Sequence, residues 1–289
     1  GDSRTPLFAI IAASFANIAL DLLFVAVFHW GIEGAAAATV IAQYVSGAGL
    51  AAYSCLRCRE LLPQRRHMRP NRRMLREIFD ISFLTCVQQS AMNFGILLIQ
   101  RLVDSFGAVT MAAFAAAVKI DTFAYLPVQD FGNAFSTFAA QNYGAGQSGR
   151  IREGLKRASA VSVGFSIVIS VAVCLLARPL MKIFISAEEE AVIAAGVRYL
   201  HIEGAFYAGI GCLFLLYGLY RAVKRPGMSV VLTVISLGTR VALAYALAGT
   251  LGESGIWLAI PIGWFLADAV GFGYWFARRD GLLQQRAMK

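Results

Sequence analysis

The chain has 289 residues, of which 58% are hydrophobic and only 15% are charged, and its mean hydropathy is +0.63. Soluble domains carry about 25% charged residues, so this composition excludes an ordinary water-soluble globular protein. A net charge of +9 would suit a nucleic-acid surface, but the basic residues gather in short segments between apolar runs. A nucleic-acid site needs a continuous solvated basic face, so we expect the lipid bilayer as partner and no nucleic acid.

Apolar runs recur along the chain at the length that a membrane-spanning helix needs. A helix crosses a hydrocarbon core of about 30 Å with about 20 residues. The predicted helix at 108–140 is too long for a straight crossing. We expect Pro127 and Gly132 to kink it, or its end to lie in the membrane interface. The sequence predicts an all-α, polytopic membrane protein of eight transmembrane helices: 7–28, 34–56, 77–102, 108–140, 158–177, 191–219, 227–248 and 254–277.

The charges alternate between the connections of these predicted helices. Connections rich in Arg and Lys alternate with connections that contain few of them, and two of the latter are acidic, at 188–190 and 252–254. The positive-inside rule places basic connections in the cytoplasm, and an even number of crossings puts both chain ends on one side. We therefore expect a bacterial inner-membrane protein with both ends cytoplasmic. The basic connections are 57–76, 150–157, 221–225 and 278–289.

The connection at 58–75 is the predicted boundary between two lobes, because it is long and carries six arginines and two prolines. Helix 7–28 and the Gly-rich break after it resemble helix 227–248 and its break, at an offset of about 220 residues. Parallel repeats of this kind are a transporter architecture. We expect residues 1–57 to be the last two helices of an N-lobe and 76–289 to be a six-helix C-lobe with a cytoplasmic tail. By symmetry, four helices are expected to precede Gly1 in a longer protein.

Polar side chains inside the first two predicted helices form the sharpest candidate site. Asn17 and Asp21 are four residues apart and share one helix face, and Thr39 lies in the next helix. Charged groups in lipid are costly and usually mark function or pairing. A carboxylate, an amide oxygen and a hydroxyl suit a small hard cation or a proton. Hydrogen bonding between the two helices is the alternative, and spacing alone does not decide between them.

A second polar set lies in the third and fourth predicted helices. Gln88, Gln89 and Lys119 are expected to line a central cavity, whereas Asp121, two residues after Lys119, points away from it and needs a partner elsewhere. Glu203 and Arg240 are the other charged residues deep in this lobe. Structural charge pairing is the favoured interpretation of these charged residues.

Enzyme motifs are absent from the sequence. It contains no HExxH or GxSxG pattern, and its three histidines lie far apart. The five cysteines are scattered, and Cys55 and Cys58 form a lone CxxC without further zinc ligands. We expect neither an enzyme nor a cofactor.

Several short motifs follow one another in a particular order and spacing: 1–6, 17–21, 31–39, 88–90, 119–121 and 140–146, followed by Arg150. In this order and spacing they resemble the multidrug and toxic compound extrusion (MATE) family over essentially the whole length. The resemblance implies twelve helices in two six-helix lobes, of which this chain would hold helices five to twelve. It also implies that Asn17, Asp21 and Thr39 belong to an N-lobe cation site, completed by an Asp on helix one. No acid lies among residues 88–93, so a C-lobe cation site of the type in some members is not expected.

The activity implied by the resemblance is secondary active antiport. Amphiphilic or cationic organic compounds would leave the cell in exchange for Na⁺ or H⁺, with the full-length protein acting as a monomer. The alternative is a flippase for a lipid-linked precursor, which would need a strongly cationic cavity for pyrophosphate. Only Lys119 and Arg240 are available for that purpose, so antiport is favoured. The sequence leaves the substrate and the coupling ion open.

Overall fold

A computed structural model describes residues 4–57 and 71–283, and its regular elements there are all helices. Most of the predicted linker, 58–70, lies outside the described residues, together with Cys58. The elements in chain order are α1 (Arg4–Asp21), the π-helix η1 (Leu22–Val27), α2 (Gly31–Arg57), α3 (Arg72–Asp104), α4 (Ala108–Gly144), α5 (Ser148–Phe184), α6 (Glu190–Gly204), α7 (Tyr207–Ala222), α8 (Pro226–Leu251) and α9 (Glu253–Leu283).

These helices account for the eight predicted crossings. Within the described residues, seven helical segments are long and apolar enough to span a membrane, and α6 and α7 together make an eighth that is bent by 52°. The prediction of an all-α, polytopic membrane protein is confirmed. The sixth crossing was expected as one helix over 191–219, but the chain breaks at Ala205–Phe206. Hydropathy gives the length of an apolar run but not the direction of the helix axis, so it could not predict the break.

The fifth predicted crossing is much longer than expected. α5 runs for 37 residues from Ser148 to Phe184, which is about 55 Å at 1.5 Å per residue. The predicted range, 158–177, covers only the apolar centre, because the charged first turns do not contribute to a hydropathy run. Both ends of α5 therefore extend beyond a hydrocarbon core of about 30 Å.

The chain divides into two compact units, one ending at Leu75 and the other beginning at Arg76. In the first unit, α1, η1 and α2 form a hairpin. Its buried residues on α2 are Gly34, Ala38 and Ala42, which share one face because they are four residues apart. Gly34 is required at the turn, since a Cβ there would lie 2.9 Å from the Cβ of Trp30. The large apolar side chains of α1 mostly point outward, as expected for contact with lipid.

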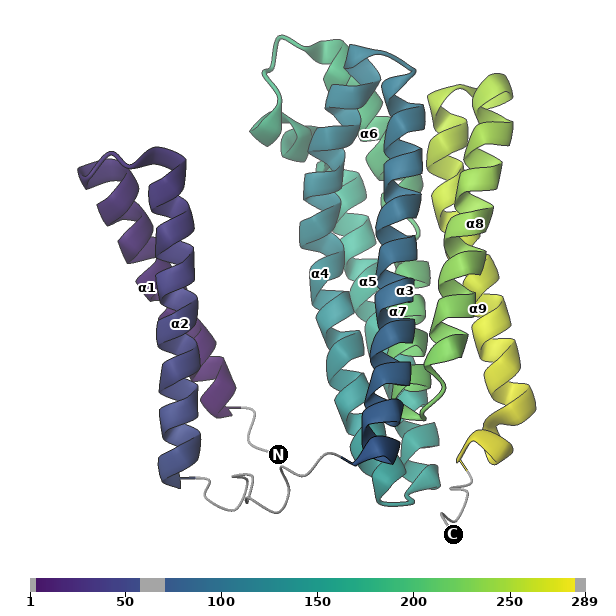
Figure 1. The fold of residues 1–289 in the computed structure, drawn as a ribbon. Helices are drawn as coiled ribbons and strands as arrows, with labels where there is room; N and C mark the ends of the chain where they lie inside the picture. Colours follow the sequence, from purple (N-terminus) through teal and green to yellow (C-terminus); the bar gives the residue numbers. More distant parts are fainter. Residues whose placement is uncertain (1–3, 58–70, 284–289) are drawn as a thin grey trace. The chain divides into compact units, whose positions relative to one another are not determined.

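In the second unit, α3 to α9 stand side by side as a bundle (Figure 1). α4 packs against α5, α6 and α7, and α8 pairs with α9. Glycines allow α4 and α7 to approach closely, because a Cβ on Gly218 would lie 2.6 Å from the carbonyl oxygen of Gly132. Helices in lipid are not held together by the hydrophobic effect. Small residues at such contacts let the backbones come close enough for van der Waals packing to hold them. α4 continues as one helix through Pro127.

Candidate functional site

The first unit brings Asn17 and Thr39 together across the hairpin. The Asn17 Nδ2 atom donates to Thr39 Oγ1 at 3.4 Å, and the Thr39 hydroxyl donates to the Ala35 carbonyl at 3.0 Å. α1 and α2 run antiparallel here, so a residue near the end of α1 faces the start of α2. Both side chains line a pocket of about 170 Å³ with Ser14, Gln43 and neighbouring residues. The hydrogen bond between the two helices that was the alternative to a cation site is thus present for Asn17 and Thr39.

Asp21 is the last residue of α1 and directly precedes η1. Its Oδ1 atom is buried and has no hydrogen-bond partner among the described residues. A buried carboxylate oxygen without a partner costs free energy. π-Helical turns are rare and are frequent at functional sites. An orphaned carboxylate beside such a turn has the character of a ligand-binding group.

The three predicted residues offer oxygens suited to a hard cation, and the Asp21 Oδ1 atom is an acceptor without a hydrogen-bond partner among the described residues. The Thr39 hydroxyl has one proton, already donated, and two lone pairs, of which one accepts from Asn17. The second lone pair and the Asn17 amide oxygen are acceptors like the Asp21 carboxylate. No hydrogen bond among the described residues joins Asp21 to Asn17 or Thr39 directly. The set fits Na⁺ or a proton chemically.

The second unit contains a buried carboxylate of a different kind. Asp121 on α4 accepts a hydrogen bond from Tyr199 at 2.6 Å and another from Tyr207. Tyr199 lies on α6 and Tyr207 is the first residue of α7, so the two bonds link both sides of the break to α4. Phe114 and Trp257 pack around Tyr199 at ring distances of 5.6 and 4.9 Å. Asp121 thus fixes the bent crossing in place.

Two neighbouring pockets of the second unit are lined by charged and amide side chains. One of about 180 Å³ contains Glu203 and Arg240, and one of about 360 Å³ contains Asn133 and Arg221. Both include Met92, Gln129, Phe214 and Tyr217, so they form adjoining parts of one cavity. The Glu203 Oε2 and Arg240 Nε atoms are buried without a hydrogen-bond partner among the described residues. Arg221 donates to Asn133 at 3.2 Å.

The predicted cavity residues divide between two places. Gln88 is buried and lines the second of these pockets together with Gln89. Lys119 is exposed, and its Nζ atom lies 5.9 Å from the centre of the Phe184 ring at the end of α5. Lys119 belongs to neither pocket lining. It also points in a different direction from Asp121 on α4.

Sequence reasoning named Asp121, Glu203 and Arg240 but missed the two tyrosines. Tyr199 and Tyr207 are separated from Asp121 by 78 and 86 residues, and a tyrosine in an apolar run has no pattern that marks it. Arg221 was assigned to a basic connection and not to the cavity. Arg221 lies in the last turn of α7, and this position is the signal that could have placed it in the cavity lining.

The MatE family model matches residues 85–246, which is more than half of the chain. The chain belongs to the MatE family. The resemblance seen in the sequence is confirmed, and with it the expectation of a transporter family in place of an enzyme. The match covers α4 to α7 whole and most of α3 and α8, so it includes the cavity of the second unit.

Similar proteins agree with this assignment. The chain is 29% identical over 276 residues to the probable multidrug resistance protein YpnP of Bacillus subtilis, covering 95% of this chain and 61% of that protein. It is 23% identical to the probable multidrug resistance protein NorM of Thermotoga maritima, covering 90% and 57%. It is 25% identical to an FAD transporter of Shewanella oneidensis, covering 91% and 59%. The chain thus spans about 60% of the length of these curated MatE relatives.

Solved structures show the same fold. A variant of the Vibrio cholerae MATE transporter VcmN superposes with a TM-score of 0.91 at 22% identity, over 99% of this chain and 65% of that one. A MOP superfamily transporter from Pyrococcus furiosus superposes with a TM-score of 0.89 at 21% identity, over 96% and 63%. The helix order of this chain is therefore that of known MATE structures.

Proposed function

We propose that this chain is part of a secondary active antiporter that exports amphiphilic or cationic organic compounds in exchange for Na⁺ or H⁺. The observation that carries the proposal is the Asp21 carboxylate, whose Oδ1 atom is buried without a partner among the described residues. Asp121, by contrast, has a tyrosine donor for each of its two carboxylate oxygens. Membership of the MatE family supplies the transporter context.

In this proposal Asp21 binds the incoming cation and Asn17 and Thr39 assist. The Asn17–Thr39 bond is long for a hydrogen bond, at 3.4 Å, so it is weak and easily exchanged for a contact with a cation. Binding of Na⁺ or a proton to Asp21 removes the cost of leaving its buried Oδ1 atom without a partner. That difference in free energy between the loaded and empty states is what couples the cation to a conformational change.

The substrate would occupy the cavity of the second unit. Amide side chains from Gln88, Gln89, Gln129 and Asn133 line it beside aromatic residues, a mixture that suits amphiphilic organic molecules. Glu203 is the single carboxylate of the two pocket linings, so in this proposal it binds the cationic group of the substrate.

An anionic cargo is the second candidate, and the cavity charge favours it. The two pocket linings contain two arginines, Arg221 and Arg240, against the single carboxylate of Glu203. One relative is named an FAD transporter. A diphosphate, in a nucleotide or in a lipid-linked precursor, would pair with both guanidinium groups.

The antiport proposal is tested in cells that lack other efflux pumps and express the full-length protein. Ethidium efflux and FAD efflux are measured for the wild type, for Asp21→Asn and for Glu188→Gln, which removes one carboxylate outside the helices. We expect Asp21→Asn to lose efflux at normal membrane levels and Glu188→Gln to retain it. Normal efflux by Asp21→Asn would refute the role of Asp21. Efflux of FAD alone, lost in Arg240→Gln, would select the anionic cargo.

A further inference from the structure

A second pocket lies away from the cavity, between the beginning of α5 and the end of α9. It has a volume of about 570 Å³ and is lined from α5 by Arg152, Lys156 and Ser159, among others. These three residues follow the i, i+4, i+7 spacing of one helix face. From α9 the lining includes Phe272, Trp275, Phe276 and Arg279, which also follow a helix face.

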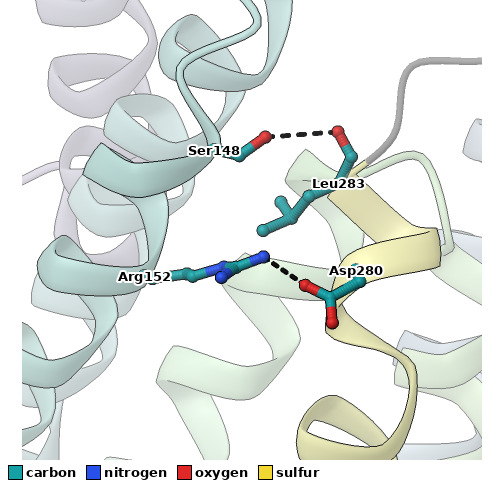
Figure 2. Close-up of polar contacts among 4 residues, drawn as sticks. All are labelled: Ser148, Arg152, Asp280 and Leu283. Carbon is teal, nitrogen blue, oxygen red and sulfur yellow. Dashed lines mark hydrogen bonds and ion pairs between the residues drawn. The ribbon is translucent and has the colours of Figure 1, made fainter.

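Two contacts hold the outer end of this pocket. The Arg152 guanidinium pairs with the Asp280 carboxylate, and the Ser148 hydroxyl donates to the Leu283 carbonyl at 3.4 Å (Figure 2). The helices are antiparallel here, since α5 begins and α9 ends at the same place. Moving inward from these contacts, α5 advances from Arg152 to Ser159 while α9 runs back toward Phe272.

The lining changes from cationic to aromatic along the same direction. Ser159 lies about 10 Å deeper than Arg152 at 1.5 Å per residue. Trp275 is buried, whereas Phe276 is 64% exposed and available to a neighbouring molecule. The Ser159 Oγ atom is buried and has no hydrogen-bond partner among the described residues. The pocket therefore offers a charged outer part, an apolar inner part and one unused polar group between them.

The charge of the outer part is positive after internal pairing. The lining holds three cations, Arg152, Lys156 and Arg279, against one carboxylate, Glu153. Glu153 pairs with Arg157, which is outside the lining, at 2.7 Å. No ion pair among the described residues neutralises Lys156 or Arg279, and Arg279 stands over the Phe276 ring at 6.0 Å. Arg152 uses part of its five-donor guanidinium for Asp280 and keeps further donors.

The position of this pocket matches the membrane interface. α5 is about 55 Å long, so its first turns lie outside a hydrocarbon core of about 30 Å. Cations at that depth meet lipid phosphates, and aromatic side chains one or two turns deeper meet the first part of the acyl chains. The order of side chains along the pocket is the order of groups along a phospholipid.

We propose that the pocket between α5 and α9 is a binding site for an anionic phospholipid of the surrounding bilayer. The phosphate binds Lys156, Arg279 and Arg152, the glycerol or ester oxygens accept from Ser159, and an acyl chain lies on Phe272 and Phe276. The occupied site ties the first turns of α5 to the last turns of α9 and adds to the Arg152–Asp280 pair.

The test is native mass spectrometry of the purified full-length protein with phosphatidylglycerol or phosphatidylcholine. The groove variant is the double substitution Lys156→Gln with Arg279→Gln, which leaves the Arg152–Asp280 pair intact. Its matched control is Arg150→Gln with Arg278→Gln, which removes two charges from the same ends of α5 and α9 at residues outside the lining. Only the groove variant loses direct charge-assisted contacts with the phosphate, so we expect it to retain phosphatidylglycerol at least tenfold more weakly than the control.

Ser159→Leu provides a second variant, because it fills the pocket and leaves every charge in place. It is also expected to lose phosphatidylglycerol while keeping the unfolding temperature measured in phosphatidylcholine. Equal losses in the groove and control variants would overturn the proposal in favour of unspecific charge attraction. Equal retention of both lipids by the wild type would also overturn it. Binding of glycerol 1-phosphate as tight as that of the lipid would assign the pocket to a soluble anion instead.

Discussion

Asp21 and Asp121 differ in whether their buried carboxylate oxygens have hydrogen-bond partners. Asp21 has an orphaned Oδ1 atom beside a π-helix, whereas both oxygens of Asp121 accept from tyrosines. The first is prepared for a ligand and the second is already satisfied within the protein. Asp21 was predictable because Asn17 lies one turn away in the same helix. The function of Asp121 was not, because its donors come from two other helices.

Replacing Asp121 tests its structural role. Asp121→Ala leaves two buried tyrosine hydroxyls without an acceptor, and each unsatisfied group costs about 1–3 kcal/mol. We expect a large drop in the midpoint of thermal unfolding of the full-length protein in detergent, followed by size-exclusion chromatography. Asp121→Asn keeps one acceptor oxygen and should lose less. Unchanged unfolding of Asp121→Ala would remove the structural assignment.

The eight crossings follow from apolar length, but their details depend on contacts between helices. The break between α6 and α7 is held by Asp121 on α4, and the approach of α4 to α7 depends on a glycine from each helix. Such contacts join residues far apart in the sequence, so hydropathy and local spacing do not contain them. The ends of α5 were missed for a related reason, since charged turns extend a helix beyond its apolar centre.

The contact between α4 and α7 gives a prediction for Gly218. An added Cβ would lie 2.6 Å from the Gly132 carbonyl oxygen, so Gly218→Ala should force the helices apart at a cost of about 1–3 kcal/mol. Gly238→Ala on α8 is the matched control, because nothing lies within 4 Å of its Cβ. It should be neutral or slightly stabilising, since Ala favours a helix over Gly by about 0.5–1 kcal/mol. Equal thermal unfolding of both variants would contradict the close contact.

At the scale of the whole chain, the charge alternation agrees with the helix order. In the second unit, the connection between α4 and α5 is followed by Arg150 and Arg152, and the opposite end of α5 leads to Glu188 and Glu189. The fold class and number of crossings were predictable from composition and charge, because a bilayer imposes them. The division near 75 and 76 coincides with the Arg-rich connection, whose residues 58–70 lie outside the described part.

The orientation of the chain is tested by thiol labelling of the full-length protein with its native cysteines replaced. Gln147→Cys and Ser186→Cys stand at opposite ends of α5, and both positions are exposed. The positive-inside rule predicts that an impermeant maleimide labels Ser186→Cys in intact cells and labels Gln147→Cys only after lysis. The reverse pattern would invert the predicted topology, and labelling of both in intact cells would remove a crossing.

The central claim is that Asp21 couples a cation to transport. The most direct measurement uses purified full-length protein in proteoliposomes, with ethidium movement followed under an imposed Na⁺ gradient and under an imposed pH gradient. Wild-type protein should accumulate substrate against its gradient with at least one of the two cations. Asp21→Asn should bind ethidium but accumulate none with either cation, because the neutral amide has no charge to exchange. Gradient-driven accumulation by Asp21→Asn at the wild-type rate would contradict the account.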